Sequence, residues 1–173
     1  MKTLILGGIR SGKSRFAETL ARKSGLDVRY IATATANDEE MAARIEAHRC
    51  RRPAGWPVVE EPFALAAGLK AGAAAERCVL VDCLTLWLTN LLLAPEGAVF
   101  GRERAALIGT LPSLPGEIIL VGNETGLGVI PLGELTRRYC DEAGRLHQDL
   151  AGLCDRVILM VAGLPLFLKG EPL

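Results

Sequence analysis

The sequence has no excess of charge of either sign, because lysine plus arginine and aspartate plus glutamate both number 20 among 173 residues. A formal charge of zero excludes the strongly basic balance of many nucleic-acid-binding proteins and gives no general attraction to an anionic lipid surface. We therefore expect no nucleic-acid partner. Any binding of phosphate must depend on a local arrangement of residues.

Cysteine is sparse, with 5 residues, and the closely spaced pairs that structural zinc sites need are absent. The odd count and the spacing exclude a disulfide framework and a structural zinc site of the usual kind. This usage is typical of a reducing compartment, and we expect a cytoplasmic protein.

Long uninterrupted apolar runs are also absent. The runs at 79–93 and 157–168 are broken by polar residues or by Gly163 and Pro165, and the run in "MKTLILGGIR" is too brief for a signal peptide. We therefore expect no membrane span. Because there is no internal repeat or linker and 50% of the residues are hydrophobic, residues 1–173 are predicted to form a single domain.

Short apolar runs predict the strands of the fold. They are almost wholly apolar rather than alternating, which is typical of strands buried on both faces. Helical patterns lie between most of them, so we predict an α/β fold with a mostly parallel sheet flanked by helices. The predicted strands are Thr3–Leu6, Val28–Ala32, Cys78–Val81, Ile118–Val121 and Val157–Val161.

Turn residues delimit the predicted helices. These helices are Lys13–Lys23, Asp38–Cys50, Leu84–Leu93, Leu132–Leu153 and an alanine-rich stretch within 63–76. Glycines inside 132–153 leave the continuity of that helix open. The stretches 94–101 and 112–116, rich in proline and glycine, are predicted to be loops.

A phosphate-binding loop is the strongest motif. "GGIRSGKS" matches G-x-x-x-x-G-K-[ST], between an apolar strand and an amphipathic helix, and predicts a P-loop NTPase-like (RecA-like) domain. Backbone N–H groups and the helix N-terminus would bind phosphate, Lys13 would act catalytically on the β and γ oxygens, and Ser14 would ligate Mg²⁺. The expected nucleotide-binding residues are Gly7, Gly8, Ile9, Arg10, Ser11, Gly12, Lys13 and Ser14.

Asp82 is the candidate for the second magnesium ligand. It follows the apolar run of "CVLVDCLT", where the carboxyl end of a buried strand would direct it toward the phosphates. Asp82 could instead cap the next helix, and the two roles can coexist.

The two histidines have different settings. His48 lies at the end of a predicted helix, followed by Arg49, Arg51 and Arg52, and neighbouring guanidinium groups would keep its imidazole neutral and nucleophilic. A histidine merely placed near a helix C-terminus, with solvated arginines after it, is the other interpretation. His147, in "AGRLHQDL", is expected to be an ordinary surface histidine.

Five motifs together carry a resemblance to a known family. "GGIRSGKSRFAE", "YIATATANDEEMAARIEAHRCRRPAGW", "VLVDCLTLWLTNLL", "VGNETGLGVIP" and "AGLPLFLK" occur in this order and cover most of the chain. The chain resembles the bifunctional adenosylcobinamide kinase / adenosylcobinamide-phosphate guanylyltransferase family of cobalamin assembly. The resemblance implies phosphorylation of adenosylcobinamide by ATP or GTP. Transfer of GMP from GTP to adenosylcobinamide phosphate follows, with His48 carrying the GMP.

The resemblance also implies further site residues. The residues after the second strand, the arginines after His48 and two acidic residues become candidates for nucleotide binding. Glu60 and its neighbour Glu61 cannot be separated by this means, and Asn123 and Glu124 remain either substrate-side or structural groups. The candidates are Ala32, Thr33, Ala34, Arg49, Arg51, Arg52, Glu60 and Asp82.

The sequence departs from the family pattern in two places. "LHQ" at 146–148 stands where the family has asparagine before glutamine, and the segment 94–117 is short.

Two rival functions remain. An ordinary P-loop small-molecule kinase without histidine chemistry is one rival, and a nucleotide-dependent switch is the other. The chain has no N-K-x-D motif, which counts against a GTPase of the usual kind. The resemblance further implies a homo-oligomer, with a trimer as the specific candidate.

Overall fold

A computed structural model describes residues 1–35, 39, 43, 46 and 55–171. Most of the predicted helix Asp38–Cys50 lies outside these residues, as do His48, Arg49, Arg51 and Arg52. The described positions within it, Glu39, Ala43 and Glu46, are helical.

Seven described strands form one sheet in the order β3-β2-β4-β5-β1-β6-β7. All neighbouring strands are parallel except β6 and β7, which are antiparallel. The strands are β1 (Lys2–Gly7), β2 (Asp27–Ala32), β3 (Val58–Glu60), β4 (Arg77–Asp82), β5 (Glu117–Asn123), β6 (Arg156–Val161) and β7 (Leu164–Lys169).

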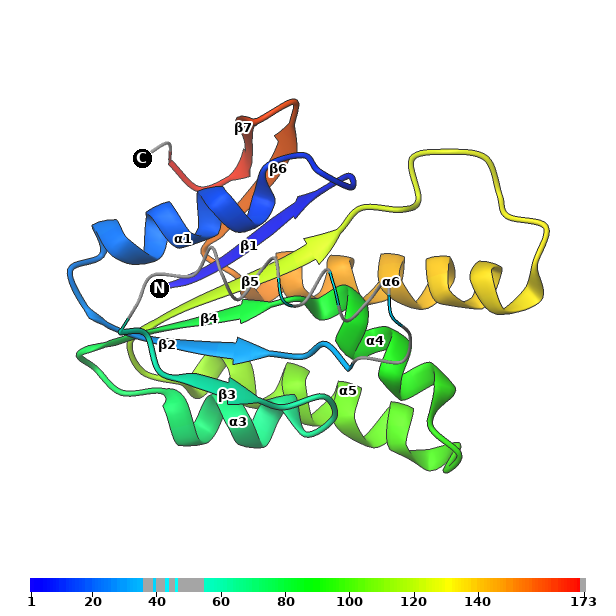
Figure 1. Ribbon diagram of the computed structural model, residues 1–173, viewed down its shortest axis with the longest axis horizontal. Helices are drawn as coiled ribbons and strands as arrows, with labels where there is room; N and C mark the ends of the chain where they lie inside the picture. The colour runs from blue at the N-terminus through cyan, green and yellow to red at the C-terminus, as the bar shows by residue number, and fades with distance from the viewer. Residues whose placement is uncertain (36–38, 40–42, 44–45, 47–54, 172–173) are drawn as a thin grey trace.

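Helices cover both faces of the sheet, with α1 on one face and α3 to α6 on the other (Figure 1). Ala17, Leu20 and Ala21 of α1 pack on one side, in contact with strand residues such as Ile5 and Tyr30. This double cover explains why the central strands are apolar on both faces. The helices are α1 (Lys13–Lys23), α3 (Leu65–Gly72), α4 (Leu84–Leu93), α5 (Ala98–Thr110) and α6 (Glu134–Leu153), with a 3₁₀ turn, η1, at Leu111–Ser113. Within the described ranges no helix is both long and apolar enough to cross a membrane.

The five predicted strands are confirmed, and α1 and α4 have the predicted bounds. The alanine-rich stretch forms α3, and α6 is continuous through Gly144 and Gly152. The loop prediction for 94–101 is partly wrong, because α5 begins at Ala98. The strands β3 and β7 were not predicted: β3 has three residues, and β7 is an edge strand interrupted in sequence by Pro165.

Trp87 of α4 is the largest fully buried side chain, and its Nε1–H donates to the carbonyl of Phe63 at 2.7 Å. We expect Trp87→Ala to lower the free energy of unfolding by about 3–5 kcal/mol, because it leaves a cavity and an unpaired carbonyl. Urea denaturation followed by circular dichroism measures this change. Trp56→Ala, at a partly buried position, is the control, and an equal loss in both variants would contradict the argument.

Candidate active site

The P-loop joins β1 to α1, and two of its glycines are required by close contacts. A Cβ at Gly7 would lie 2.5 Å from the carbonyl oxygen of Met160 and 2.7 Å from Ser11 Oγ. Gly12 has a φ of 94°, and a Cβ there would lie 3.3 Å from Cα of Gly163. The N–H of Gly163 also donates to the Ser11 carbonyl at 3.0 Å. The end of β6 and the β6–β7 turn therefore pack against the P-loop.

Two polar side chains of the loop are suited to phosphate. Within the described part of the chain, the buried Ser11 Oγ has no hydrogen-bond partner, and an orphaned polar atom of this kind calls for a ligand or water. Lys13 is 8% exposed, and its Nζ donates to the Gly8 carbonyl at 2.6 Å. Burial lowers the pKa of Lys13, while the neighbouring Cys83 and Asp82 oppose this shift. A bound phosphate would place further negative charge beside this buried ammonium group, which favours its charged form.

Asp82 ends β4, two strands away from β1, and accepts a hydrogen bond from the Tyr30 hydroxyl at 3.0 Å. Cys83, not Asp82, is the N-cap residue of α4. Burial, with Asp82 adding to it, raises the pKa of the Cys83 thiol to about 11, which keeps this thiol protonated and unreactive near neutral pH. Asp82 thus stays the candidate for a metal ligand at the carboxyl edge of the sheet.

The donor set fits magnesium better than a metal held by protein groups alone. Among the described residues no three His, Cys, Asp or Glu side chains are grouped closely enough to hold an ion. Mg²⁺ typically takes one or two protein ligands and completes its shell with water and phosphate oxygens. The Ser14 hydroxyl and the Asp82 carboxylate are oxygen ligands of this kind.

Thr33 is buried, and its hydrogen bonds link the end of β2 to the end of β4. Its hydroxyl donates to the Cys83 carbonyl at 2.6 Å and accepts from the Cys83 N–H at 3.0 Å, and its own carbonyl accepts from Asn90 Nδ2 at 2.8 Å. The hydroxyl is therefore already engaged. Any contact of the Ala32–Ala34 segment with a nucleotide would involve its backbone or Ala34.

The two adjacent glutamates have different surroundings. Glu61 Oε1 accepts from the N–H groups of Phe63 at 3.1 Å and Ala64 at 2.7 Å, at the start of α3. Glu60 is exposed at the end of β3, and the strand register places it beside Ala32, which in turn pairs with Asp82. Glu61 thus has a structural role, and Glu60 remains the candidate for nucleotide contact.

His147 is not a surface histidine, which corrects the prediction from the sequence. Its side chain is 12% exposed, and Nδ1 lies 3.8 Å from Glu124 Oε2. Burial lowers the pKa of His147, and Glu124 partly offsets this effect. The imidazole fits because Gly122 has no side chain: a Cβ there would lie 3.2 Å from His147 Nε2.

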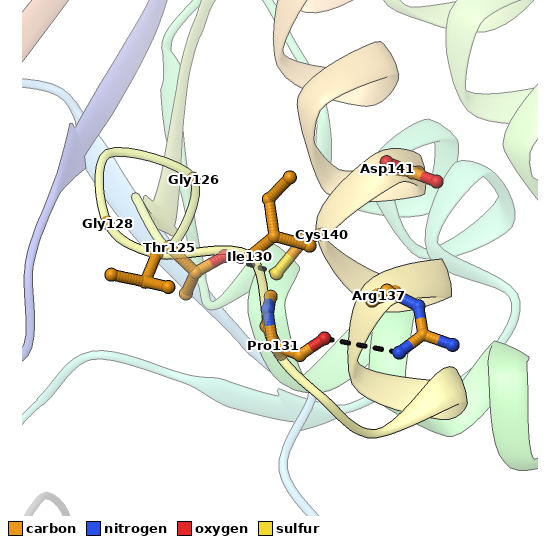
Figure 2. A pocket seen from close by; sticks show the side chains of 9 residues that line it. Thr125, Gly126, Gly128, Ile130, Pro131, Arg137, Cys140 and Asp141 are labelled. Carbon is orange, nitrogen blue, oxygen red and sulfur yellow. Dashed lines mark hydrogen bonds between the residues drawn. The ribbon is translucent and has the colours of Figure 1, made fainter.

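The loop that joins β5 to α6 is drawn in yellow in Figure 1. Residues of this loop line two pockets. One, of about 380 Å³, is lined by P-loop residues 8–11, Glu124, Leu127 and residues of β6. The other, of about 440 Å³, lies between this loop and α6. Figure 2 shows Pro131 beside Arg137, whose Nη1 donates to the Pro131 carbonyl at 3.3 Å. Thr125 lies beside Cys140, with 4.0 Å between Oγ1 and Sγ.

Sequence comparison matches residues 3–168 to the family described as cobinamide kinase / cobinamide phosphate guanyltransferase. The chain belongs to this family. It is 65% identical over its full length to the bifunctional adenosylcobalamin biosynthesis protein CobP of Pseudomonas aeruginosa, and all of that protein is covered. It is also 39% identical to the bifunctional adenosylcobalamin biosynthesis protein CobU of Escherichia coli, over 98% of this chain and 100% of that protein.

The fold of this member of the cobinamide kinase / guanyltransferase family occurs in more distant proteins. A RadB recombinase structure is similar with a TM-score of 0.50 and 15% identity, over 91% of this chain and 73% of that one. This likeness concerns the fold alone. It confirms the prediction of a P-loop NTPase-like, RecA-like domain with a mostly parallel sheet.

Sequence reasoning left the roles of Asn123 and Glu124 open, and the structure places both beside the P-loop. Asn123 is the register partner of Gly7, and the Glu124 N–H donates to the Gly7 carbonyl at 2.9 Å. Both residues lie beside the P-loop because β5 is the neighbour of β1 in the sheet, between β1 and β4. A sequence motif alone does not specify that order.

Proposed function

We propose that this chain catalyses two consecutive reactions on a corrinoid. It phosphorylates adenosylcobinamide with ATP or GTP, and then transfers GMP from GTP to adenosylcobinamide phosphate to give adenosylcobinamide-GDP. The observation that carries this proposal is the shaped P-loop, with its orphaned Ser11 Oγ and buried Lys13, in a chain matched to the family over residues 3–168. We further propose a homo-oligomer, a trimer, in the cytoplasm.

Charge neutralisation and positioning would drive the first reaction. The P-loop N–H groups, Ser11 and Lys13 bind and neutralise the β and γ phosphates, and the acceptor hydroxyl displaces the nucleoside diphosphate in line. Magnesium, held by Ser14 and Asp82, would neutralise phosphate charge when bound. Lys13 Nζ donates one hydrogen bond to the Gly8 carbonyl, and the ammonium group has further N–H donors for phosphate oxygens.

Covalent catalysis would carry the second reaction. Neutral His48 attacks the α-phosphorus of GTP, an N–P bond forms, and pyrophosphate leaves. The phosphate of adenosylcobinamide phosphate then attacks the same phosphorus, and the N–P bond breaks as the imidazole departs. Arg49, Arg51 and Arg52 would neutralise the triphosphate during the first of these steps. Support for these roles comes from the family resemblance, since these four residues lie outside those the structure describes.

Product analysis tests the pair of activities. With adenosylcobinamide, ATP and magnesium, we expect mass spectrometry to find the corrinoid monophosphate. On addition of GTP we expect conversion to the GDP-linked corrinoid, with release of pyrophosphate. A chain that stops at the monophosphate would be an ordinary small-molecule kinase. A chain that binds nucleotide but leaves the corrinoid unchanged would be a switch, and either result contradicts the proposal.

A further inference from the structure

The phosphorylation step needs a group that accepts the proton of the acceptor hydroxyl. Lys13 is a cation and cannot serve, and Asp82 is the candidate magnesium ligand. Glu60 ends β3, which lies four strand positions from β1, or roughly 19 Å at the usual strand spacing. None of the residues assigned so far fills this role.

Glu124 lies beside the first half of the P-loop. It follows β5, the strand next to β1, and its N–H donates to the Gly7 carbonyl at 2.9 Å. It also lines the pocket of about 380 Å³ together with residues 8–11. Of the described residues that line this pocket, Glu124 alone is acidic.

The carboxylate of Glu124 is oriented and still accessible. Oε1 accepts from the Gly126 N–H at 2.5 Å, and the side chain is 21% exposed. On the other side, Oε2 lies 3.8 Å from His147 Nδ1. Burial lowers the pKa of His147, which favours the uncharged imidazole. The Glu124 carboxylate therefore does not form a strong ion pair with this neighbour.

Three exposed apolar side chains, as well as the exposed Arg10, line the same pocket. Ile9 at the tip of the P-loop and Leu127 are 77% and 81% exposed, and Val161 of β6 is 56% exposed. These apolar side chains suit a bulky acceptor with apolar surface, which would shield the reacting groups from water once bound. A hydroxyl carried by that acceptor would reach the P-loop and Glu124 together.

We propose that Glu124 is the catalytic base of the phosphorylation step, an inference that rests on the proposed function. The acceptor oxygen forms a bond to the γ-phosphorus, and the bond from that phosphorus to the β–γ bridging oxygen breaks. The hydroxyl proton passes to the Glu124 carboxylate, and the nucleoside diphosphate leaves. Guanylyl transfer does not need this base, because its acceptor is a phosphate that is already ionised.

Glu124→Gln tests the inference, because the amide oxygen can still accept from the Gly126 N–H but the side chain cannot take up a proton. We expect kcat for adenosylcobinamide phosphorylation to fall at least ~100-fold, with KM for ATP little changed. Guanylyl transfer to adenosylcobinamide phosphate, prepared with the wild-type protein, should continue at close to the wild-type rate. Glu96→Gln, an exposed glutamate in the loop before α5, is the matched control.

Glu124→Asp is the second variant, because it keeps the charge and withdraws the carboxylate by one methylene. We expect its phosphorylation kcat to lie between those of the wild type and Glu124→Gln. A Glu124→Gln protein that phosphorylates at the wild-type rate, or loses both activities equally, would overturn the inference; so would a Glu124→Asp protein as fast as the wild type. If the wild-type chain itself fails to phosphorylate adenosylcobinamide, the proposed function fails instead.

Discussion

His48→Ala is expected to abolish covalent labelling of the protein by GTP labelled at the α-phosphate. Guanylyl transfer should fall at least ~10³-fold, because without the imidazole no N–P bond can form. Phosphorylation of adenosylcobinamide should remain close to the wild-type rate, since that step uses the P-loop. The measurement is incubation with labelled GTP and magnesium, denaturation, and detection of acid-labile label on the protein.

His147→Asn is the control for this labelling, because His147 is the other histidine of the chain. Its imidazole is buried against Glu124, and the variant should still take up label. Label that survives in His48→Ala would exclude His48 as the carrier of GMP. Loss of phosphorylation together with labelling in His48→Ala would point instead to a general defect of the nucleotide site.

The P-loop and the central strands could be predicted because their signals are local. Residues 7–14 contain the whole phosphate-binding pattern, and the geometry requires glycine at positions 7 and 12. A strand buried on both faces needs an uninterrupted apolar run, which is visible in the sequence without knowledge of its neighbours. The same reasoning fails for β7, where an edge strand tolerates Pro165 and leaves Leu164 and Leu166 exposed.

Contacts between distant segments explain the rest of what the sequence did not reveal. The side chain of Thr33 bonds to the backbone of Cys83, 50 positions further along the chain, which no local pattern indicates. The burial of His147 could have been inferred in part. Ala143, Leu146 and Leu150 form the buried stripe of α6, and position 147 lies on that stripe by its spacing. The gap that admits the imidazole depends on Gly122 of another element, which only the fold shows.

Lys13→Met is expected to reduce both activities, with kcat/KM for phosphorylation falling about 10²–10³-fold or more. Methionine has a similar length but supplies neither charge nor donor to the phosphates. Because we propose that the P-loop binds the triphosphate in both reactions, labelling of His48 by GTP should fall together with phosphorylation. Steady-state kinetics of the first reaction and labelling in the second measure the two effects. Lys70→Met, at an exposed position in α3, is the matched control.

The same variant should unfold no more easily than the wild type in the absence of nucleotide. Lys13 is buried, and burial lowers its pKa in the folded protein, so the unfolded chain binds this proton more tightly than the folded one. The free energy of unfolding of the wild type, relative to that of Lys13→Met, should therefore rise as the pH approaches the ordinary lysine pKa. At lower pH the wild type should be the less stable of the two proteins by the largest margin. Urea denaturation of both proteins across the pH range measures the difference, in which the titration of other groups cancels. A Lys13→Met protein that is less stable than the wild type at neutral pH would show that the ammonium group stabilises the fold. The presence of this charge in a buried site would then not depend on a bound phosphate.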